Sequence, residues 1–421
     1  MESRGWKSSA EPVFSGTGLL RKGARMTVKV IAARALIQLA GVLLPIAVLS
    51  TAIAQESVSP FPIHGGINIA GPFVRTREAT AYPNGGRSEY WTRTMYPGWY
   101  NGDDLRQEGF DFVRIAINPA VLLESPALRR GQFLDEIDRE IQFYRSAGLR
   151  VIADLHFWKP DHEVWTEQAI VGDGSSAPSS AYRALVVEIA DRLVRYPQGD
   201  VALELLNEPP TQNCETGWIP LQQALVRAVR KSAARLPIIV TGCGGQLDGL
   251  LALDRSKIDL SDSNLIFSFH FYEPFLFTHQ GAYRLYLHID GIPYPAADGS
   301  VERAVGLTNA SIDRLDLSIA DAVAAKASAA KEILRYFAQA PGSDFVDLRF
   351  DKVSAWARAN GISPTRVLLG EFAAINWRKT DRPDYLAARI RWDNDVRAAA
   401  AKRGFASAYW NLPYPKGKIF R

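Results

Sequence analysis

Short apolar runs without polar alternation recur along this chain, and segments with helical periodicity separate them. Such runs, rich in β-branched residues and leucine, are typical of strands buried on both faces of a parallel sheet. Because strand and helix alternate eight times, the pattern favours a closed parallel (β/α)8 barrel, the TIM barrel, over an open sheet. The expected strands are residues 66–69, 112–118, 150–156, 201–207, 238–242, 265–271, 367–371 and 405–410, with helices such as 133–147, 181–196, 221–235 and 385–403 between them.

The segment 133–147 shows the helical period most clearly. Its apolar residues fall at i, i+4, i+8 and i+11 and form one stripe: Phe133, Ile137, Ile141 and Tyr144. Charged residues, among them Asp135, Asp138, Glu140 and Arg145, lie elsewhere on the segment, which is the pattern of a helix on the outside of a barrel.

About 90 residues, 274–365, separate the sixth expected strand from the seventh, far more than one helix requires. The first part is rich in aromatic and turn residues, and 312–340 and 344–360 are expected to be helical. Because long loops at the carboxyl ends of strands usually carry specificity, this insertion is a candidate for shaping a binding cleft. A rigid structural cover is the alternative.

Only eleven residues follow Trp410, too few for the helix that normally follows an eighth strand. The seam between the last and first strands must then be covered by residues 55–62, by a helix of the insertion or by a second subunit. A truncated chain is the other explanation.

The amino-terminal 54 residues differ from the rest. Residues 35–50 (ALIQLAGVLLPIAVLS) are apolar, follow Lys29 and Arg34, and precede a small-x-small pattern at residues 52–54. This predicts a secretory signal peptide that is cleaved after Ala54, with Met26 as an alternative start. An uncleaved anchor is less favoured, because the run is interrupted by Gln38 and Pro45 and is shorter than the ~20 residues that a membrane span needs. The mature chain, 55–421, is expected to be one domain in the periplasm or outside the cell, without stable membrane association.

Removing the leader changes the charge. The leader holds seven of the 49 Lys and Arg and two of the 45 Asp and Glu, so 42 basic and 43 acidic residues remain and the net charge changes from +4 to about −1. This balance gives no reason to expect a nucleic-acid partner or an anionic membrane surface. Nothing in the sequence specifies an oligomeric state.

The two cysteines, Cys214 and Cys243, follow the fourth and fifth expected strands. Neighbouring strands bring their loops together at one end of a barrel, so these thiols could form a disulfide in an oxidising compartment. Two free thiols are the alternative. No metal site is apparent, because the six histidines are scattered and none stands at a familiar ligand spacing.

Two of the expected strands end in a glutamate: Glu208 closes VALELLNE and Glu371 closes VLLGE. The carboxyl ends of barrel strands are where (β/α)8 enzymes perform their chemistry. Other chemically active side chains lie at the same strand ends: Arg114, His156, Asn207, His270, Tyr272 and Trp410. A glutamate here could instead be a solvated cap, and Arg114 could be a structural partner for Asp154 or Glu204.

Paired carboxylates of this kind are the apparatus for glycoside hydrolysis. One carboxylic acid protonates the leaving oxygen while the other carboxylate attacks the anomeric carbon. An arginine close to Glu371 would favour its ionised form, and Glu208 could then act first as acid and later as base. Asn207 could hydrogen-bond a sugar hydroxyl near the reacting carbon.

With these residues in strand order, the chain resembles glycoside hydrolase family 5, the cellulase family of retaining (β/α)8 enzymes, over about residues 63–412. The family pattern is Arg on the second strand, His on the third, Asn-Glu-Pro on the fourth, His-x-Tyr on the sixth, Glu on the seventh and Trp on the eighth. The resemblance implies that Glu208 is the acid/base and Glu371 the nucleophile, that a covalent glycosyl-enzyme forms, and that no cofactor is needed. His156, His270 and Tyr272 could orient the glutamates and the sugar without transferring protons.

Aromatic residues give separate support, because the flat faces of pyranose rings stack on indole. Of the nine tryptophans in the mature chain, seven fall at or beside the carboxyl ends of strands, and Trp99, Trp158, Trp377 and Trp410 are the candidates for substrate binding. Packing of loops onto the barrel rim is the alternative for some of them.

The sequence therefore predicts a retaining hydrolase of a β-linked polysaccharide, with an endo-acting β-1,4-glucanase as the first expectation. A β-mannanase, a β-1,3-glucanase or an exo-acting β-glucosidase of the same family are alternatives. A carbohydrate-binding barrel without catalytic activity is the alternative from another class.

Overall fold

The computed structural model describes residues 60–73, 76–78, 88–90, 101–158, 165–172, 174–254, 256–259, 261–282, 286–375 and 383–410. The expected signal peptide and its cleavage site lie outside these residues, as do Trp99 and Trp377.

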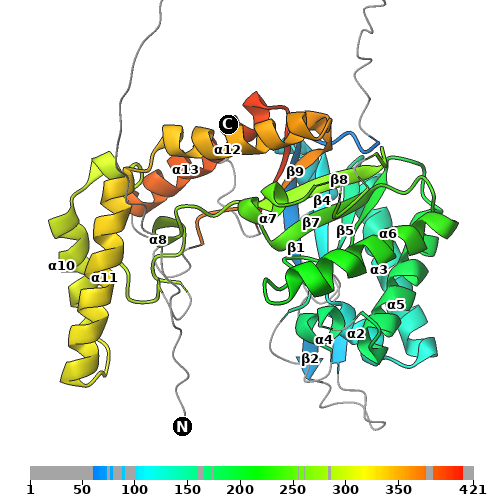
Figure 1. The fold of residues 1–421 in the computed structure, drawn as a ribbon, viewed down its shortest axis with the longest axis horizontal. Helices are drawn as coiled ribbons and strands as arrows, with labels where there is room; N and C mark the ends of the chain where they lie inside the picture. Colours follow the sequence, from blue (N-terminus) through cyan, green and yellow to red (C-terminus); the bar gives the residue numbers. More distant parts are fainter. Residues whose placement is uncertain are drawn as a thin grey trace, which may run out of the picture. The chain divides into compact units, whose positions relative to one another are not determined.

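Eight parallel strands close into a barrel in the order β1-β10-β9-β8-β7-β6-β5-β4 (Figure 1). The expected (β/α)8 barrel is therefore confirmed. Its strands are β1 (Gly65–Phe73), β4 (Phe112–Ile117), β5 (Arg150–Leu155), β6 (Val201–Glu204), β7 (Ile238–Gln246), β8 (Leu265–His270), β9 (Val367–Phe372) and β10 (Ala406–Tyr409). The strands β2 (Thr76–Glu78) and β3 (Ser88–Tyr90) form a separate antiparallel pair.

Helices follow the strands as the sequence pattern predicts. The expected stripe on α3 (Ala127–Ser146) is confirmed, because all four of its apolar residues are buried. Within the described residues, the other helices outside the insertion are α1 (Gly102–Gln107), α2 (Pro119–Glu124), α4 (Glu167–Val171), α5 (Ala177–Leu193), the one-turn helix η2 (Cys214–Trp218), α6 (Ile219–Ser232), α7 (Leu247–Leu251) and α13 (Pro383–Lys402). No helix within the described ranges is long and apolar enough to cross a membrane.

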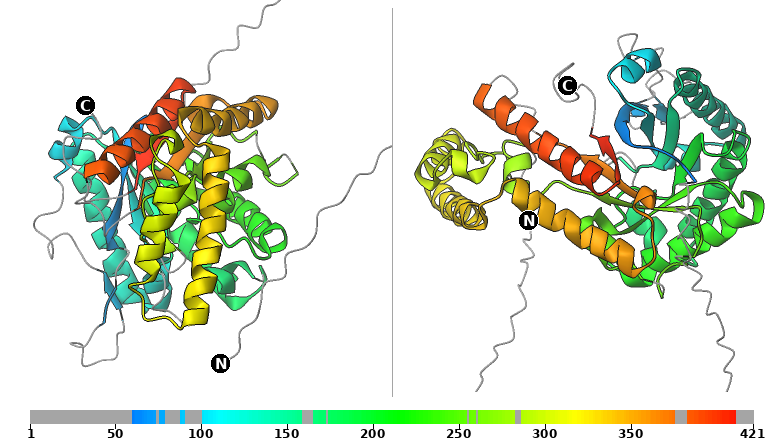
Figure 2. Two further views of the ribbon diagram at one scale, coloured as in Figure 1. Left: turned by 90° about the vertical axis from the view of Figure 1, so that its left-hand side faces the viewer. Right: turned by 90° about the horizontal axis from the view of Figure 1, so that it is seen from above.

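The insertion between β8 and β9 is more helical than expected. It contains α8 (Phe275–Thr278), η3 (Ala296–Asp298), α10 (Val301–Ile312), α11 (Ile319–Gln339), α12 (Ser343–Ala359) and η4 (Pro364–Arg366). The helices α10 and α11 pack against each other as a pair (Figure 2), and α12 packs against α13.

The expected helix over 312–340 is wrong at its start, and α10 was not predicted. The hydroxyls of Ser300 and Ser318 cap α10 and α11 by accepting from the backbone N–H three residues later. The cap at Ser318 begins α11 within the expected segment, after α10 has ended at Ile312.

The inside of the barrel is filled at the amino-terminal ends of the strands. Side chains from seven strands meet there: Phe112, Ile152, Ala202, Ile239, Ile266, Leu368, Ala406 and Ala408. Phe61 and Ile63, which precede β1, join this cluster, and Phe61 is fully buried. Gly66 is required beside them, because a Cβ there would lie 2.4 Å from the Phe112 ring. Residues 55–62 were one candidate for covering the seam between the last and first strands. The described part of this segment instead places Phe61 in the interior of the barrel.

Phe61→Ala is expected to lower the free energy of unfolding by about 3–5 kcal/mol, because it leaves a cavity at the base of the barrel. Urea unfolding followed by tryptophan fluorescence measures this. Leu128→Ala is the control, since that side chain is 81% exposed on α3 and its loss should change the midpoint little. Equal midpoints for Phe61→Ala and the parent protein would contradict the assignment of Phe61 to the core.

Candidate active site

A fully buried arginine on β4 lies at the centre of the polar layer above this core. Arg114 donates from Nε and Nη2 to the two oxygens of Glu204, at 2.6 and 2.9 Å. Its Nη2 is also 3.0 Å from Asp154 Oδ2, and its Nη1 is 2.8 Å from Glu371 Oε1. Burial opposes the charge of the guanidinium, but Asp154, Glu204 and Glu371 together raise its pKa well above the usual value. Arg114 is therefore both a structural partner of Asp154 and Glu204 and a direct neighbour of Glu371.

Two side-chain amides complete the shell around Arg114. Asn68 of β1 and Asn207, which follows β6, each accept from the guanidinium through Oδ1 at 2.9 Å. The Nδ2 of Asn68 donates to the carbonyl oxygen of Gly370 at 3.0 Å, so it also ties β1 to β9. Every N–H group of the guanidinium thus faces an oxygen, as a buried cation requires.

Glu371 lies within β9, and its side chain is 5% exposed. Its Oε1 accepts from Arg114, and its Oε2 accepts from the Tyr272 hydroxyl at 2.8 Å. Charge-assisted bonds to both oxygens hold the carboxylate in one orientation. A fixed, water-excluded carboxylate suits attack on a carbon atom.

Glu208 differs from Glu371 in backbone and exposure. It lies four residues beyond the end of β6, has a φ of 35° and keeps 37% of its side chain open to solvent. Gly245 lies directly beneath it, since a Cβ there would be 2.8 Å from Glu208 Cγ. The carboxyl end of β7 therefore supports this glutamate closely.

Two polar side chains contact the Oε1 atom of Glu208. Gln246 Nε2 donates to it at 2.9 Å, and His270 Nδ1 lies 2.8 Å away. When the imidazole proton of His270 is on Nδ1, both neighbours donate to Oε1 and the acidic proton of Glu208 belongs on Oε2. Burial of the carboxyl group raises the pKa of Glu208, although nearby positive charge and the bond from Gln246 oppose the shift.

His270 lies between the two glutamates. Its Nδ1 is 2.8 Å from Glu208 and 3.5 Å from Glu371 Oε2. One donor atom from each of the three residues lies within 4.8 Å of the others, so the two carboxyl groups have oxygens no farther apart than that. This short separation is the geometry of retaining glycosidases, because inverting enzymes leave about 6.5–9.5 Å for a water molecule.

His156 lies on the other side of Asn207. Its Nε2 is 3.2 Å from Asn207 Nδ2, and its ring stacks on Trp410 with centroids 5.5 Å apart and planes 15° apart. Trp158 lies 6.1 Å from the same ring. Burial lowers the pKa of both His156 and His270 to about 4, so both imidazoles are neutral near pH 7.

The structure thus brings together nearly all of the residues that the sequence selected: Arg114, His156, Trp158, Asn207, Glu208, His270, Tyr272, Glu371 and Trp410.

Four further polar residues of the site were not selected as functional residues from the sequence, although two of them were named as possible structural partners of Arg114: Asn68, Asp154, Glu204 and Gln246. The period of two along a strand could have found three of them. Gly66, Ile152 and Ala202 are at the inward base layer, so the residues two positions later, Asn68, Asp154 and Glu204, face inward with Arg114. Gln246 had no such signal, because β7 extends past its expected end.

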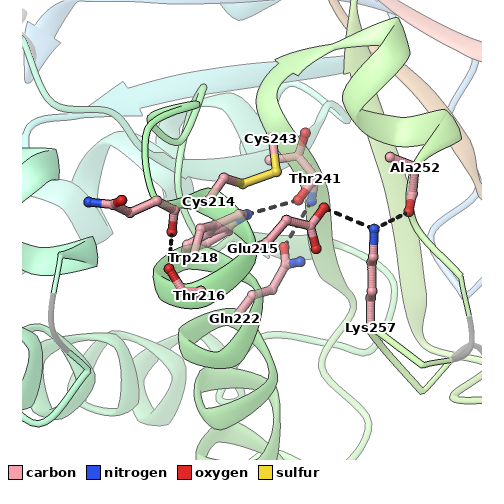
Figure 3. Close-up of a disulfide and its surroundings, with 10 residues drawn as sticks. Cys214, Glu215, Thr216, Trp218, Gln222, Thr241, Cys243, Ala252 and Lys257 are labelled. Carbon is pink, nitrogen blue, oxygen red and sulfur yellow. Dashed lines mark hydrogen bonds and ion pairs between the residues drawn. A yellow bond between two sulfur atoms is a disulfide. The ribbon is translucent and has the colours of Figure 1, made fainter.

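Cys214 of η2 and Cys243 of β7 form a disulfide (Figure 3), with 5.7 Å between their Cα atoms. Beside it, Trp218 Nε1 donates to the carbonyl oxygen of Thr241 at 3.0 Å. The N–H of Gly244 also bonds the carbonyl oxygen of Pro209 at 2.8 Å. The loop that follows Glu208 is therefore fastened to the segment that carries Gln246.

The sequence pattern described as "Cellulase (glycosyl hydrolase family 5)" matches residues 81–415. The chain belongs to glycoside hydrolase family 5. The resemblance found in the motifs is thereby confirmed, and it extends over most of the chain.

Relatives of this family 5 chain include Endoglucanase 3 from Fibrobacter succinogenes, 25% identical over 302 residues, and Endoglucanase H from Acetivibrio thermocellus, 22% identical over 323 residues. The matches cover 68% and 76% of this chain, but only 42% and 27% of those two proteins. The chain therefore spans less than half the length of either relative.

Solved structures with the same fold include the cellulose synthase subunit Z of Clostridioides difficile, with a TM-score of 0.55, 23% identity and coverage of 85% of this chain and 93% of that one. Cel5A of Thermotoga maritima, solved with mannotriose, has a TM-score of 0.56, 21% identity and coverage of 85% and 92%. A family 5 xyloglucanase from Bacteroides ovatus has a TM-score of 0.57, 16% identity and coverage of 84% and 69%. At these identities the likeness establishes the fold.

Replacing both cysteines by alanine is expected to lower the free energy of unfolding by about 3–4 kcal/mol, because the disulfide closes a loop between residues 29 apart. Urea unfolding with and without dithiothreitol measures this. The reductant should weaken the parent protein and leave the double variant unchanged. A parent protein insensitive to reductant under unfolding conditions would contradict the bond.

Proposed function

We propose that this protein is a retaining glycoside hydrolase that cleaves internal β-1,4 linkages of a glucan. The observation that carries the proposal is the pair Glu208 and Glu371, with carboxyl oxygens within 4.8 Å of each other beside His270. The relatives named as endoglucanases support the substrate class.

In the first step Glu371 attacks the anomeric carbon while Glu208 gives its Oε2 proton to the leaving oxygen. Arg114 and Tyr272 hold the attacking carboxylate, and Glu208, whose side chain is partly open to solvent, is the group proposed to meet the leaving oxygen. In the second step Glu208, now ionised, removes a proton from water, which attacks the glycosyl-enzyme and releases the sugar with its configuration retained.

The raised pKa of Glu208 and the two bonds that hold Glu371 divide the roles in this way. A carboxyl group with a raised pKa remains protonated at higher pH, as an acid must.

We also propose that the protein acts in the periplasm or outside the cell. The apolar leader segment at 35–50 and the cleavage pattern that ends at Ala54 support export. The disulfide between Cys214 and Cys243 is of the kind that persists in oxidising compartments.

Glu371→Gln is expected to abolish hydrolysis of carboxymethyl-cellulose, measured as reducing ends, because an amide cannot form the glycosyl-enzyme. A panel of mixed-linkage glucan, xyloglucan, β-1,3-glucan, mannan and xylan fixes the linkage. Glu188→Gln, on the outer face of α5, is the control and should retain activity. Activity that persists in Glu371→Gln would refute the nucleophile, and binding without turnover across the panel would favour a carbohydrate-binding role.

Glu208→Gln is expected to lower kcat/KM on polysaccharide by on the order of 10²- to 10⁴-fold, because general acid assistance is lost. Aryl cellobiosides whose leaving group needs no proton should be affected far less. Azide should restore their turnover and give a β-glycosyl azide, since a small anion can reach the glycosyl-enzyme. Equal losses for both kinds of substrate would contradict an acid role.

Gln246→Leu is expected to move the alkaline limb of the kcat/KM profile to higher pH. The bond from Gln246 favours ionised Glu208 and lowers its pKa, so losing the bond raises that pKa and keeps the acid protonated further into the alkaline range. The measurement is kcat/KM from pH 4 to 10 on a soluble β-glucan. Gln223→Leu, whose amide bonds the Lys257 carbonyl oxygen on the outside of the barrel, should leave the limb in place. A limb that is unmoved or moved to lower pH in Gln246→Leu would count against the assignment.

A further inference from the structure

Asp154 of β5 is fully buried beside the site and has no part in the two-step reaction above. Its Oδ2 lies 3.0 Å from Arg114 Nη2 and 3.0 Å from His156 Nδ1. Its Oδ1 is buried and has no hydrogen-bond partner in the described part of the chain. A buried carboxyl group that directs one oxygen at two neighbours and leaves the other without a partner calls for a specific reason.

The contact with Arg114 limits where the hydrogen atoms of Asp154 and His156 can lie. A guanidinium nitrogen cannot accept a proton, so the ion pair with Arg114 favours Oδ2 as the oxygen without a hydrogen. If Asp154 carries a proton, that proton lies on Oδ1. Because burial also keeps His156 neutral, with a pKa of about 4, the single imidazole proton belongs on Nδ1, where it can be donated to Oδ2.

This placement leaves His156 Nε2 as a bare acceptor, and the atom that faces it is Asn207 Nδ2, a donor, at 3.2 Å. At the other end of the same amide, Oδ1 accepts from Arg114 Nη2. With the imidazole proton on Nε2 instead, two donors would face each other, and turning the amide over would set its NH₂ against the guanidinium. One tautomer of His156 and one orientation of Asn207 therefore satisfy all the contacts.

We propose that Asp154 is a positioning residue that acts through His156: it holds the imidazole in the Nδ1–H tautomer, and His156 in turn fixes the amide of Asn207. The proposal rests on the proposed function and deepens it. Asn207 precedes Glu208, and its second N–H remains to bind a hydroxyl of the sugar that reacts. Asp154 thereby sets the direction of that hydrogen bond without touching the substrate.

The charge of Asp154 is not needed for this role. Burial raises the pKa of Asp154 to about 7 against the opposing effect of Arg114, so acid and carboxylate forms coexist near neutral pH. In both forms Oδ2 lies beside the Arg114 guanidinium and accepts from His156. An asparagine can do the same with its amide oxygen in that place, whereas an alanine cannot.

The first test needs no substrate. Long-range ¹H–¹⁵N spectra of the ¹⁵N-histidine-labelled protein at pH 6–8, with His156→Gln to assign the signal, should show His156 neutral and protonated at Nδ1. A proton on Nε2, or a doubly protonated ring, would overturn the proposal whatever the activity is. This measurement also separates failure of the proposal from failure of the proposed function.

The second test compares Asp154→Asn with Asp154→Ala. Asp154→Asn should keep the tautomer and stay within about threefold of the parent kcat, since the acceptor is retained. Asp154→Ala should shift the His156 tautomer and lower kcat by on the order of 10²-fold, with a smaller effect on KM, because the misplaced amide serves the transition state most. Asp135→Ala, at an exposed ion pair with Arg192, is the control for general effects.

Two outcomes of the second test would overturn the proposal. One is an unchanged kcat and His156 tautomer in Asp154→Ala, and the other is an equal loss of kcat in Asp154→Asn and in Asp154→Ala that has folded. If Asp154→Ala does not fold, the proposal is still tested by the spectrum of the parent protein and by the His156 tautomer and kcat of Asp154→Asn. A shifted His156 tautomer in Asp154→Asn would refute the role of Asp154 as acceptor.

Discussion

One buried positive charge organises this end of the barrel. Arg114 is fully buried, and an unpaired guanidinium inside a protein would cost many kcal/mol in lost hydration. The cost is offset only when the planar donors meet oxygens in the right directions. Those oxygens come from β1, β5, β6, the turn after β6, and β9. The register of five separate segments must therefore be correct before Arg114 can be buried.

The same constraint gives the two glutamates their different properties. Glu371 belongs to a strand and is held through both oxygens, so its position follows from the barrel itself. Glu208 stands on a turn with a positive φ and depends on its neighbours for support: Gly245 beneath it, Gln246 beside it, and the disulfide that fastens the following loop. A rigid nucleophile and a more exposed acid are what double displacement requires, because the acid must also meet the leaving group and then water.

The start of the long insertion has a supporting role at the site. The hydroxyl of Thr278 in α8 donates to the carbonyl oxygen of Tyr272 at 2.5 Å, and the backbone carbonyl oxygen of Thr278 accepts from the N–H of Ile375 at 2.6 Å. His279 packs against the Tyr272 ring, 5.5 Å between centroids. The start of the insertion thus joins the ends of β8 and β9. This contact agrees with the interpretation of the insertion as a rigid structural cover. The pair α10 and α11 makes no hydrogen bond to the glutamates within the described residues, and a role of the insertion in specificity stays a prediction.

The sequence by itself determined the strands, the barrel, the family and the residues at the strand ends, because apolar runs and motif order are local properties that survive without coordinates. It located the apolar stripe of α3 and the positions of Glu208 and Glu371, but it divided the insertion wrongly where Ser300 and Ser318 begin two separate helices.

Only the tertiary structure decided that Arg114 pairs with Asp154, Glu204 and Glu371 at once, that Gln246 reaches Glu208, and that Phe61 fills the base of the barrel. The contacts of Arg114 and Phe61 join residues that are 40 to more than 250 positions apart in the sequence. The contact of Gln246 with Glu208 depends instead on the extension of β7 beyond its expected end. Distances between strands follow from barrel closure and register, and no periodicity along one segment contains them.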